Sequence, residues 1–312
     1  MTKKNSSKRN GFLKDISTSP KKITLPIAIF VLILSGCLTY NKISTKEITN
    51  KESKFISDSD NKVNVQDHYD ADSNNEAQDI RLAHAGNLVN NNVGVPVLYY
   101  HSINESADNE VTMTPEMLKK QLQYIKDQGY ITLTISELKD YLLKDAPIPK
   151  NSIVITFDDG YMDNYRNAFP ILKNLNMVAT IFCITSNLDG SYYLSKDAIS
   201  EMSHYGIDIE SHTVTHPKLN KLTYDDQLKE LSESKKTLES ITGKEVTSIA
   251  YPFGNFNDDT IKAAKTAGYT LGFTTNRGLS DRNDNPLKLD RIYVSSKYNM
   301  ETFKEILSKT EK

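Results

Sequence analysis

The chain has 312 residues, of which 25% are charged and 38% are hydrophobic, and its formal net charge at neutral pH is −2. This length is enough for one large domain or two small ones, and the composition is that of a globular protein. Basic residues cluster only near the N-terminus, which argues against nucleic acid as a partner, and two cysteines exclude a disulfide framework or a cysteine-rich zinc site.

Residues 1–36 are predicted to be an export signal or membrane segment. They carry seven lysines and arginines and one aspartate, a net charge of +6, which leaves −8 for the rest of the chain. A basic region before a short apolar run, here 23–36, is typical of an export signal. Residues 34–37, LSGC, resemble a bacterial lipobox and predict lipidation of Cys37. The alternative is an uncleaved transmembrane helix as far as Tyr40; both place the remaining chain on the extracytoplasmic face of the bacterial membrane.

Residues 37–92 are rich in Asn, Asp, Ser and Lys and show no hydrophobic period, which predicts a flexible tether. From residue 93 to the end at 312, short apolar runs alternate with amphipathic stretches, which predicts a single catalytic domain. The expected strands are 95–100, 130–134, 152–157, 178–184, 207–211, 247–251, 269–274 and 291–294. The expected helices lie near 115–128, 136–143, 161–175, 195–205, 223–242, 258–267 and 300–309.

This alternation predicts an α/β fold, an irregular (β/α) TIM-like barrel of seven or eight strands. An open doubly wound sheet is the alternative. No Gly-x-Gly-x-x-Gly segment follows the first expected strand, so a dinucleotide site is not expected.

Catalytic residue types follow several of the expected strands. His101 ends the first strand, Asp158 and Asp159 end the third, and His212 and His216 follow the fifth. Barrel enzymes carry their active sites at the C-terminal ends of the strands, so these side chains are expected to meet at one rim. Because neighbouring strand residues point to opposite sides, one aspartate could bind a metal while the other handles a proton.

The two histidines of SHTVTHP are four residues apart, but β-branched residues lie between them and Pro217 follows, which favours a loop over a helix. Together with one of the two carboxylates, they would make a set of two histidines and one aspartate. Three protein ligands and an open position are the layout of a catalytic Zn²⁺ site, and Fe²⁺, Co²⁺ or Ni²⁺ would also suit these ligands.

Residues 156–160, TFDDG, and 211–217, SHTVTHP, resemble the first two motifs of the polysaccharide deacetylase (NodB-homology) family, carbohydrate esterase family 4. The resemblance covers residues 93–310, the whole predicted barrel. In that family the first aspartate is the general base, and the second aspartate and both histidines bind the metal.

Carried over residue by residue, the resemblance implies that Asp158 is the base and that Asp159, His212 and His216 are metal ligands. The third motif of the family, commonly Arg-x-Pro-Tyr, is Tyr251-Pro252-Phe253 here and lacks the arginine that pairs with the base. The family uses the backbone N–H at the tyrosine position to bind the oxyanion. Phe253 can keep this role, with Tyr251 as a neighbouring substrate contact.

The C-terminal Leu-x-His motif of the family is also missing, because no histidine follows His216. Residues 98–101, LYYH, stand instead at the start of the domain, as in the permuted branch that trims poly-N-acetylglucosamine in biofilms, which implies that His101 is the general acid. Residues 289–292, LDRI, resemble that branch too. Arg291 is therefore either the missing partner of Asp158 or a surface residue beside a strand, and the two hypotheses are equally favoured.

The resemblance implies a metal-dependent enzyme that removes N-acetyl groups from a cell-surface polysaccharide, with poly-β-1,6-N-acetylglucosamine as the first candidate. Peptidoglycan and chitin-like oligomers are alternative substrates. Two other hypotheses are a non-catalytic carbohydrate-binding lipoprotein and a barrel glycosidase. The glycosidase is disfavoured, because adjacent aspartates are poorly placed to bracket a glycosidic bond, which takes carboxyls ~5 Å apart in retaining enzymes.

Overall fold

The computed structural model describes residues 86–106 and 108–310, all within one compact unit of the chain. The predicted export signal, the lipobox cysteine Cys37 and most of the predicted tether lie outside these residues. Among the helices that are described, none combines the length and the apolar character needed to cross a bilayer.

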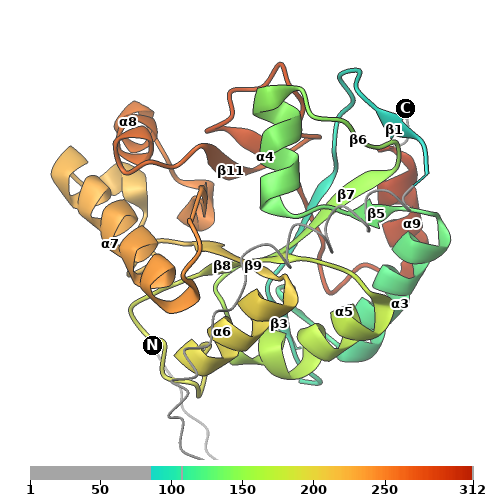
Figure 1. Ribbon diagram of the computed structural model, residues 1–312. Coiled ribbons are helices and arrows are strands. Elements are labelled where there is room, and N and C mark those ends of the chain that lie inside the picture. The colour runs from blue at the N-terminus through green and yellow to red at the C-terminus, as the bar shows by residue number, and fades with distance from the viewer. Residues whose placement is uncertain (1–85, 107, 311–312) are drawn as a thin grey trace, which may run out of the picture. The chain divides into compact units, whose positions relative to one another are not determined.

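Seven parallel strands form a closed barrel at the centre of the domain (Figure 1). In ring order they are β2 (Val97–Tyr100), β7 (Ser152–Phe157), β8 (Thr180–Cys183), β9 (Asp208–Ser211), β10 (Ser248–Ala250), β11 (Leu271–Arg277) and β12 (Leu289–Tyr293). The ring closes because β2 pairs with β12 on one side and with β7 on the other. A short strand, β5 (Ile131–Thr132), pairs with β7 beside the ring. The predicted irregular barrel is confirmed, and the open sheet is excluded.

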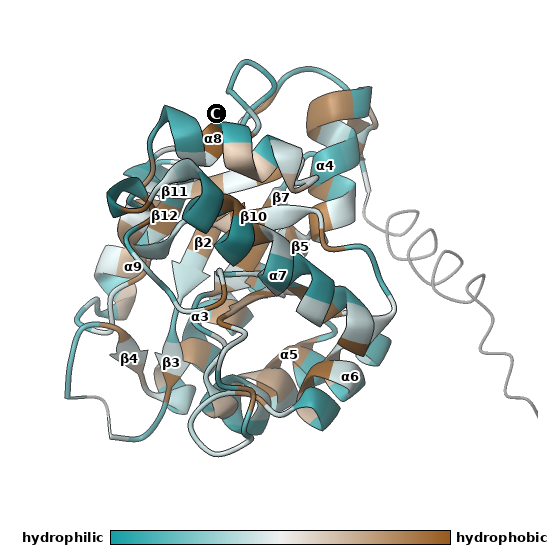
Figure 2. Ribbon diagram, turned by 90° about the vertical axis from the view of Figure 1, so that its left-hand side faces the viewer, coloured by the Kyte–Doolittle hydropathy of each residue, from teal (hydrophilic) through white to brown (hydrophobic). Residues whose placement is uncertain are grey.

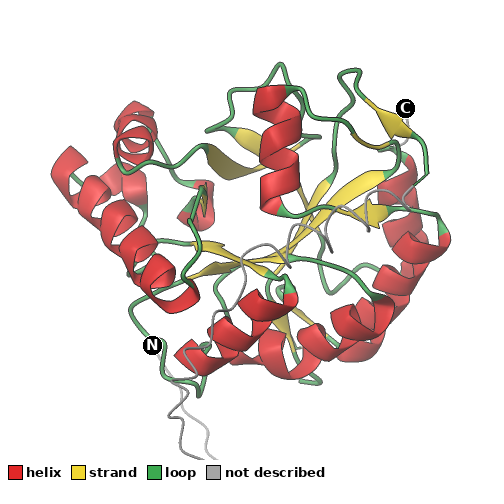
Figure 3. Ribbon diagram, in the orientation of Figure 1, coloured by secondary structure: helices red, strands yellow, loops and turns green. Residues whose placement is uncertain are grey.

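Seven helices surround the barrel in the described part of the chain (Figure 3). They are α3 (Pro115–Asp127), α4 (Ile135–Lys144), α5 (Phe169–Leu175), α6 (Lys196–Tyr205), α7 (Tyr224–Thr242), α8 (Asp258–Thr266) and α9 (Met300–Ser308). Local sequence sets where several of them begin. The side chains of Thr114, Thr223 and Asn257 each accept a hydrogen bond from a backbone N–H in the first turn of α3, α7 and α8. Such caps satisfy donors that a helix start leaves unpaired.

Alternate strand residues build two apolar layers. Val97, Val154 and Phe182 belong to the cluster that fills the barrel, whereas Leu98 and Ile155 belong to the cluster between strands and helices. This alternation follows from the two-residue period of a β-strand. The helices are amphipathic to match: α7 packs against β9, while its outward surface is hydrophilic (Figure 2).

The structure differs from the predicted boundaries at two places. The tether was predicted to reach residue 92, but β1 (Leu88–Val89) pairs with β6 (Ile148–Pro149), so the folded domain begins no later than Leu88. The predicted helix over 161–175 is a π-helix, η1 (Asn164–Ala168), followed by α5. Pro170 lacks a backbone N–H and cannot continue a regular hydrogen-bond ladder into the preceding turn, which explains the break.

Short elements complete the loops at the strand ends. β3 (Ser102–Ile103) pairs in parallel with β4 (Thr112–Met113) directly after β2. Two 3₁₀ turns, η2 (Leu219–Lys221) and η3 (Pro252–Gly254), follow β9 and β10.

Candidate active site

The predicted convergence of side chains at the C-terminal strand ends is observed. Asp159, His212 and His216 form the tightest group: Oδ1 of Asp159 lies 3.4 Å from Nε2 of each histidine, and the two Nε2 atoms lie 3.1 Å apart. One potential ligand atom from each residue lies within 4.8 Å of the others. We call this group the triad.

The donor chemistry of the triad fits a divalent metal ion. Nδ1 of His212 lies 2.7 Å from the carbonyl oxygen of Ala250, so this nitrogen carries a proton and donates it, which leaves Nε2 as the ring nitrogen that faces the other two residues. Burial, with the neighbouring His212, lowers the pKa of His216 to about 4, which keeps that imidazole neutral at neutral pH. Two imidazole nitrogens and one carboxylate that converge on a point are a suitable ligand set for Zn²⁺ or a similar cation.

Both histidines lie on a loop, residues 211–217, and not on a helix, as predicted. Thr213 and His216 have φ angles of 69° and 58°, in the left-handed region that ends regular structure. A carboxylate from α7 braces the loop: Glu230 accepts hydrogen bonds from the backbone N–H groups of Val214 and Thr215, each at 2.9 Å. Sequence reasoning missed Glu230, because it is one of several acidic residues on a long polar helix.

The two aspartates separate at a tight turn after β7. Asp159 and Gly160 have φ angles of 74° and 72°. A Cβ on Gly160 would lie 3.1 Å from Sγ and 3.2 Å from Cα of Cys183, so glycine is needed here both for its conformation and for the close approach of β8. The turn directs Asp159 to the histidines and leaves Asp158 to a different partner, as expected.

That partner is Arg291 from β12. Its guanidinium donates two hydrogen bonds of 2.8 Å to the two carboxylate oxygens of Asp158, and its side chain is completely buried. Nε of Arg291 donates to the carbonyl oxygen of Thr274 at 3.0 Å, and the guanidinium lies 4.2 Å from the ring centroid of Tyr99. The cationic-partner hypothesis for Arg291 thus agrees with the structure, and the surface hypothesis does not.

Arg291 decides the charge of Asp158. Burial alone would raise the pKa of this carboxyl, but the charge and hydrogen bonds of Arg291 outweigh it, and the pKa lies below its ordinary value. Asp158 is therefore ionised at neutral pH, the state in which a carboxylate accepts a proton.

His101 lies at the end of β2, and its ring is close to those of Tyr99 and Tyr293, with centroids 5.9 and 6.1 Å apart. Burial lowers the pKa of His101 and outweighs the opposite influence of Asp158 and Asp159. β2 pairs with β7 so that Tyr100 is opposite Phe157, and the backbone N–H of Asp158 donates to the carbonyl oxygen of Tyr100 at 2.9 Å. His101 and Asp158 therefore follow neighbouring strands at the same rim.

The side chains of Phe253 and Tyr251 differ in their exposure to solvent. Phe253 has a φ of 58°, and its ring is 56% exposed and lies 4.4 Å from the ring of His216. Tyr251 is completely buried and donates a hydrogen bond from its hydroxyl to the carbonyl oxygen of Leu287 at 2.9 Å. The predicted substrate contact by the Tyr251 side chain does not agree with this placement, because the side chain belongs to the core beneath the loop.

Comparison with known proteins agrees with this site. A family model described as polysaccharide deacetylase matches residues 145–272. A protein of Bacillus subtilis, whose name assigns it to the polysaccharide deacetylases, is 39% identical over 201 residues, which cover 64% of this chain and 71% of that protein. The chain belongs to the polysaccharide deacetylase family. Members of this family are amide hydrolases, so the chain is an enzyme.

Two further members carry more specific names. The poly-β-1,6-N-acetyl-D-glucosamine N-deacetylase of Staphylococcus epidermidis is 34% identical over 199 residues, which cover 59% of this chain and 68% of that protein. The structure of the deacetylase PplD of Streptococcus pyogenes, solved with acetate, covers 71% of this chain and all of that one, with a TM-score of 0.65 and 33% identity.

Proposed function

We propose that the protein is a metal-dependent deacetylase that removes N-acetyl groups from N-acetylglucosamine units of a cell-surface polysaccharide, with poly-β-1,6-N-acetylglucosamine as the first candidate. The observation that carries the proposal is the pairing of Asp158 with Arg291 beside the triad. This places a proton acceptor next to a set of metal ligands in one site. The name of the staphylococcal relative supports the choice of polymer.

Asp159, His212 and His216 would hold a divalent cation, which when bound supplies Lewis acidity toward the amide carbonyl and the attacking water. Asp158 accepts one proton from the water as its oxygen bonds to the acetyl carbon. The backbone N–H of Phe253 donates to the oxygen that becomes negative. His101 donates a proton to the nitrogen as the C–N bond breaks, so that acetate and a free amine leave. Because burial lowers the pKa of His101, the imidazole must first take up the proton that it donates. The side chains thus supply the proton acceptor and the proton donor that a stable amide needs.

The proposal is tested by acetate release from three polymers: poly-β-1,6-N-acetylglucosamine, peptidoglycan and chitin oligomers. The test uses the domain from residue 86 onward, loaded with Zn²⁺ or Co²⁺. We expect acetate to be released fastest from the first polymer, with no new reducing ends. New reducing ends would indicate a glycosidase, and binding without acetate release would indicate the non-catalytic alternative.

His101→Ala is expected to leave metal content near that of the wild type and to lower kcat for amide cleavage by roughly 10²-fold or more, because the amine must then leave without its proton donor. An acetyl ester with a good leaving group needs little protonation, so its hydrolysis is expected to suffer less. The measurement compares kcat on both substrates. Near wild-type amide cleavage would exclude His101 as the acid.

We also propose that the protein is anchored on the extracytoplasmic face of the bacterial membrane, through lipid on Cys37 or through an uncleaved N-terminal helix. The basic residues and apolar run within 1–36 support an anchor. Cys37→Ser is expected to prevent lipidation and either release the protein into the medium or leave an uncleaved precursor. Mass spectrometry of the mature N-terminus and membrane fractionation test this. An unchanged N-terminus with full membrane retention would favour the helix.

A further inference from the structure

The π-helix η1 follows the turn that carries the aspartates, and it contacts the loop that carries His101. Asn164, at its start, is completely buried and donates a hydrogen bond from Nδ2 to the carbonyl oxygen of His101 at 2.7 Å. The preceding residue, Asp163, accepts hydrogen bonds from the hydroxyl of Ser102 at 2.6 Å and the backbone N–H of Ile103 at 2.9 Å. The side chains of Asp163 and Asn164 therefore hydrogen-bond three consecutive residues, 101–103, which we call the His101 loop.

The imidazole of His101 depends on this backbone attachment. Its Nδ1 is buried and has no hydrogen-bond partner among residues 86–106 and 108–310. The neighbouring rings of Tyr99 and Tyr293 make only aromatic contacts with it. Because no described residue fixes the ring through Nδ1, the position of its other nitrogen is set mainly by the backbone from which the side chain projects.

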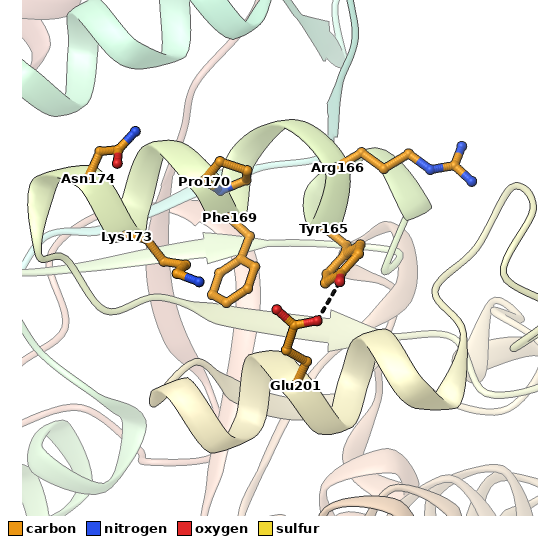
Figure 4. Close-up of a pocket in the computed structure, with 7 residues that line it drawn as sticks. All are labelled: Tyr165, Arg166, Phe169, Pro170, Lys173, Asn174 and Glu201. Atoms are coloured by element: carbon orange, nitrogen blue, oxygen red, sulfur yellow. Dashed lines mark hydrogen bonds between the residues drawn. The ribbon is translucent and has the colours of Figure 1, made fainter. Parts of the chain in front are cut away.

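The π-helix is itself held on its outer side. Figure 4 shows Tyr165 pointing toward α6, where its hydroxyl hydrogen-bonds Glu201, and the rings of Tyr165 and Phe169 lie 5.9 Å apart. On the inner side the segment packs against β3. The hydrogen bonds of a π-helix span one residue more than those of an α-helix, and such segments often occur at functional sites. Here Asp163 and Asn164 face the His101 loop, and they lie only four and five positions after Asp159.

We propose that Asp163 and Asn164 are positioning residues that fix the His101 imidazole relative to the proton acceptor Asp158. Only five residues separate Asp158, the proton acceptor, from Asn164, whose side chain hydrogen-bonds the backbone of His101. This short segment therefore links the position of the proton donor to that of the proton acceptor. This inference rests on the proposed function, because it needs His101 to be the proton donor.

Asn164→Ala removes the bond to the His101 carbonyl. We expect metal content to stay at the wild-type level and kcat for amide cleavage to fall between roughly 10-fold and 10²-fold, since a displacement of about 1 Å can cost that much. Hydrolysis of an activated acetyl ester should change by less than about threefold, because departure of its leaving group needs little help. Ser102→Ala is a gentler variant, which removes one bond to Asp163 and should shift the same ratio of amide to ester rates in the same direction.

Asn167→Ala is the matched control. Asn167 also lies on η1 and donates from Nδ2 to a carbonyl of the same loop, that of Ile103 at 2.7 Å, two residues beyond His101. We expect its amide-to-ester ratio to change less than that of Asn164→Ala, because its bond holds the backbone two residues beyond His101. An equal change of this ratio in Asn167→Ala and Asn164→Ala would overturn the assignment, and so would an equal loss of amide and ester hydrolysis in Asn164→Ala.

The double variant His101→Ala with Asn164→Ala separates this inference from the proposed function. If Asn164 acts through His101, the double variant should cleave amides within about twofold of His101→Ala alone, because the two changes remove one contribution. Losses that multiply would overturn the positioning role and leave His101 as the acid. Wild-type amide cleavage by His101→Ala would instead overturn both.

Discussion

Alanine at Asp159, His212 or His216 is expected to remove both the bound metal and the activity. The three ligand atoms lie within 4.8 Å of one another, and each ligand is one of only three in this group, so the loss of one leaves too few to hold the ion. Lewis acidity supplies several kcal/mol to the transition state, and amide turnover should therefore fall by roughly 10³-fold or more.

Metal content after dialysis and acetate release are measured on the same samples. His204→Ala is the matched control, because His204 is an exposed histidine near the end of α6 whose Nδ1 lies 2.7 Å from the carbonyl oxygen of Ser200. It should retain full metal content and activity. Retention of one equivalent of metal by any of the three triad variants would show that the ligand set is wrong.

Asp158→Asn is expected to keep the metal and lose most of the turnover, by a factor of roughly 10² to 10⁴. The amide has nearly the shape of the carboxylate but cannot accept the proton of water. The same substitution leaves the completely buried Arg291 without a counter-charge, and breaking a buried pair costs about 3–5 kcal/mol. Thermal unfolding is therefore measured beside kcat.

A variant that remains folded at the assay temperature gives a clean result for Asp158. Full metal occupancy with a large loss of kcat would agree with a base that does not bind the metal. If Asp158→Asn loses metal to the same degree as Asp159→Ala, the roles of the two aspartates have been assigned incorrectly.

The strand ends and the residues that follow them could be predicted from the sequence. The β-branched run of β7, the Asp-Asp-Gly turn and the two histidines after β9 are local signals, and the barrel rule brings them to one rim. The placement of His101 beside them follows from the same rule, since it ends β2. What the sequence alone left open was the partner of Asp158, because a buried Arg291 and an exposed one look the same in a short apolar strand.

Supporting residues were harder to find, because their role depends on tertiary contacts. Glu230 and Asn164 lie within helical stretches whose polar residues are usually solvated, and only packing shows that they face the loops of the site. Tyr251 shows the opposite error: proximity in sequence to Phe253 suggested a substrate contact, whereas its side chain points into the core. The pairing of Leu88–Val89 with β6 was missed because a two-residue strand has no detectable period.

The closure of the ring has a consequence for how the enzyme is made. Asp158 and Arg291 are 133 positions apart, and β12 fills the gap between β11 and β2. Until β12 joins the sheet, the carboxylate of β7 lacks its guanidinium partner and the ring remains open. Contacts between such distant segments form slowly, because a long loop must first be closed. We therefore expect that the active site is complete only once the final strand has joined the ring, and that a chain cut before β12 does not hydrolyse the amide.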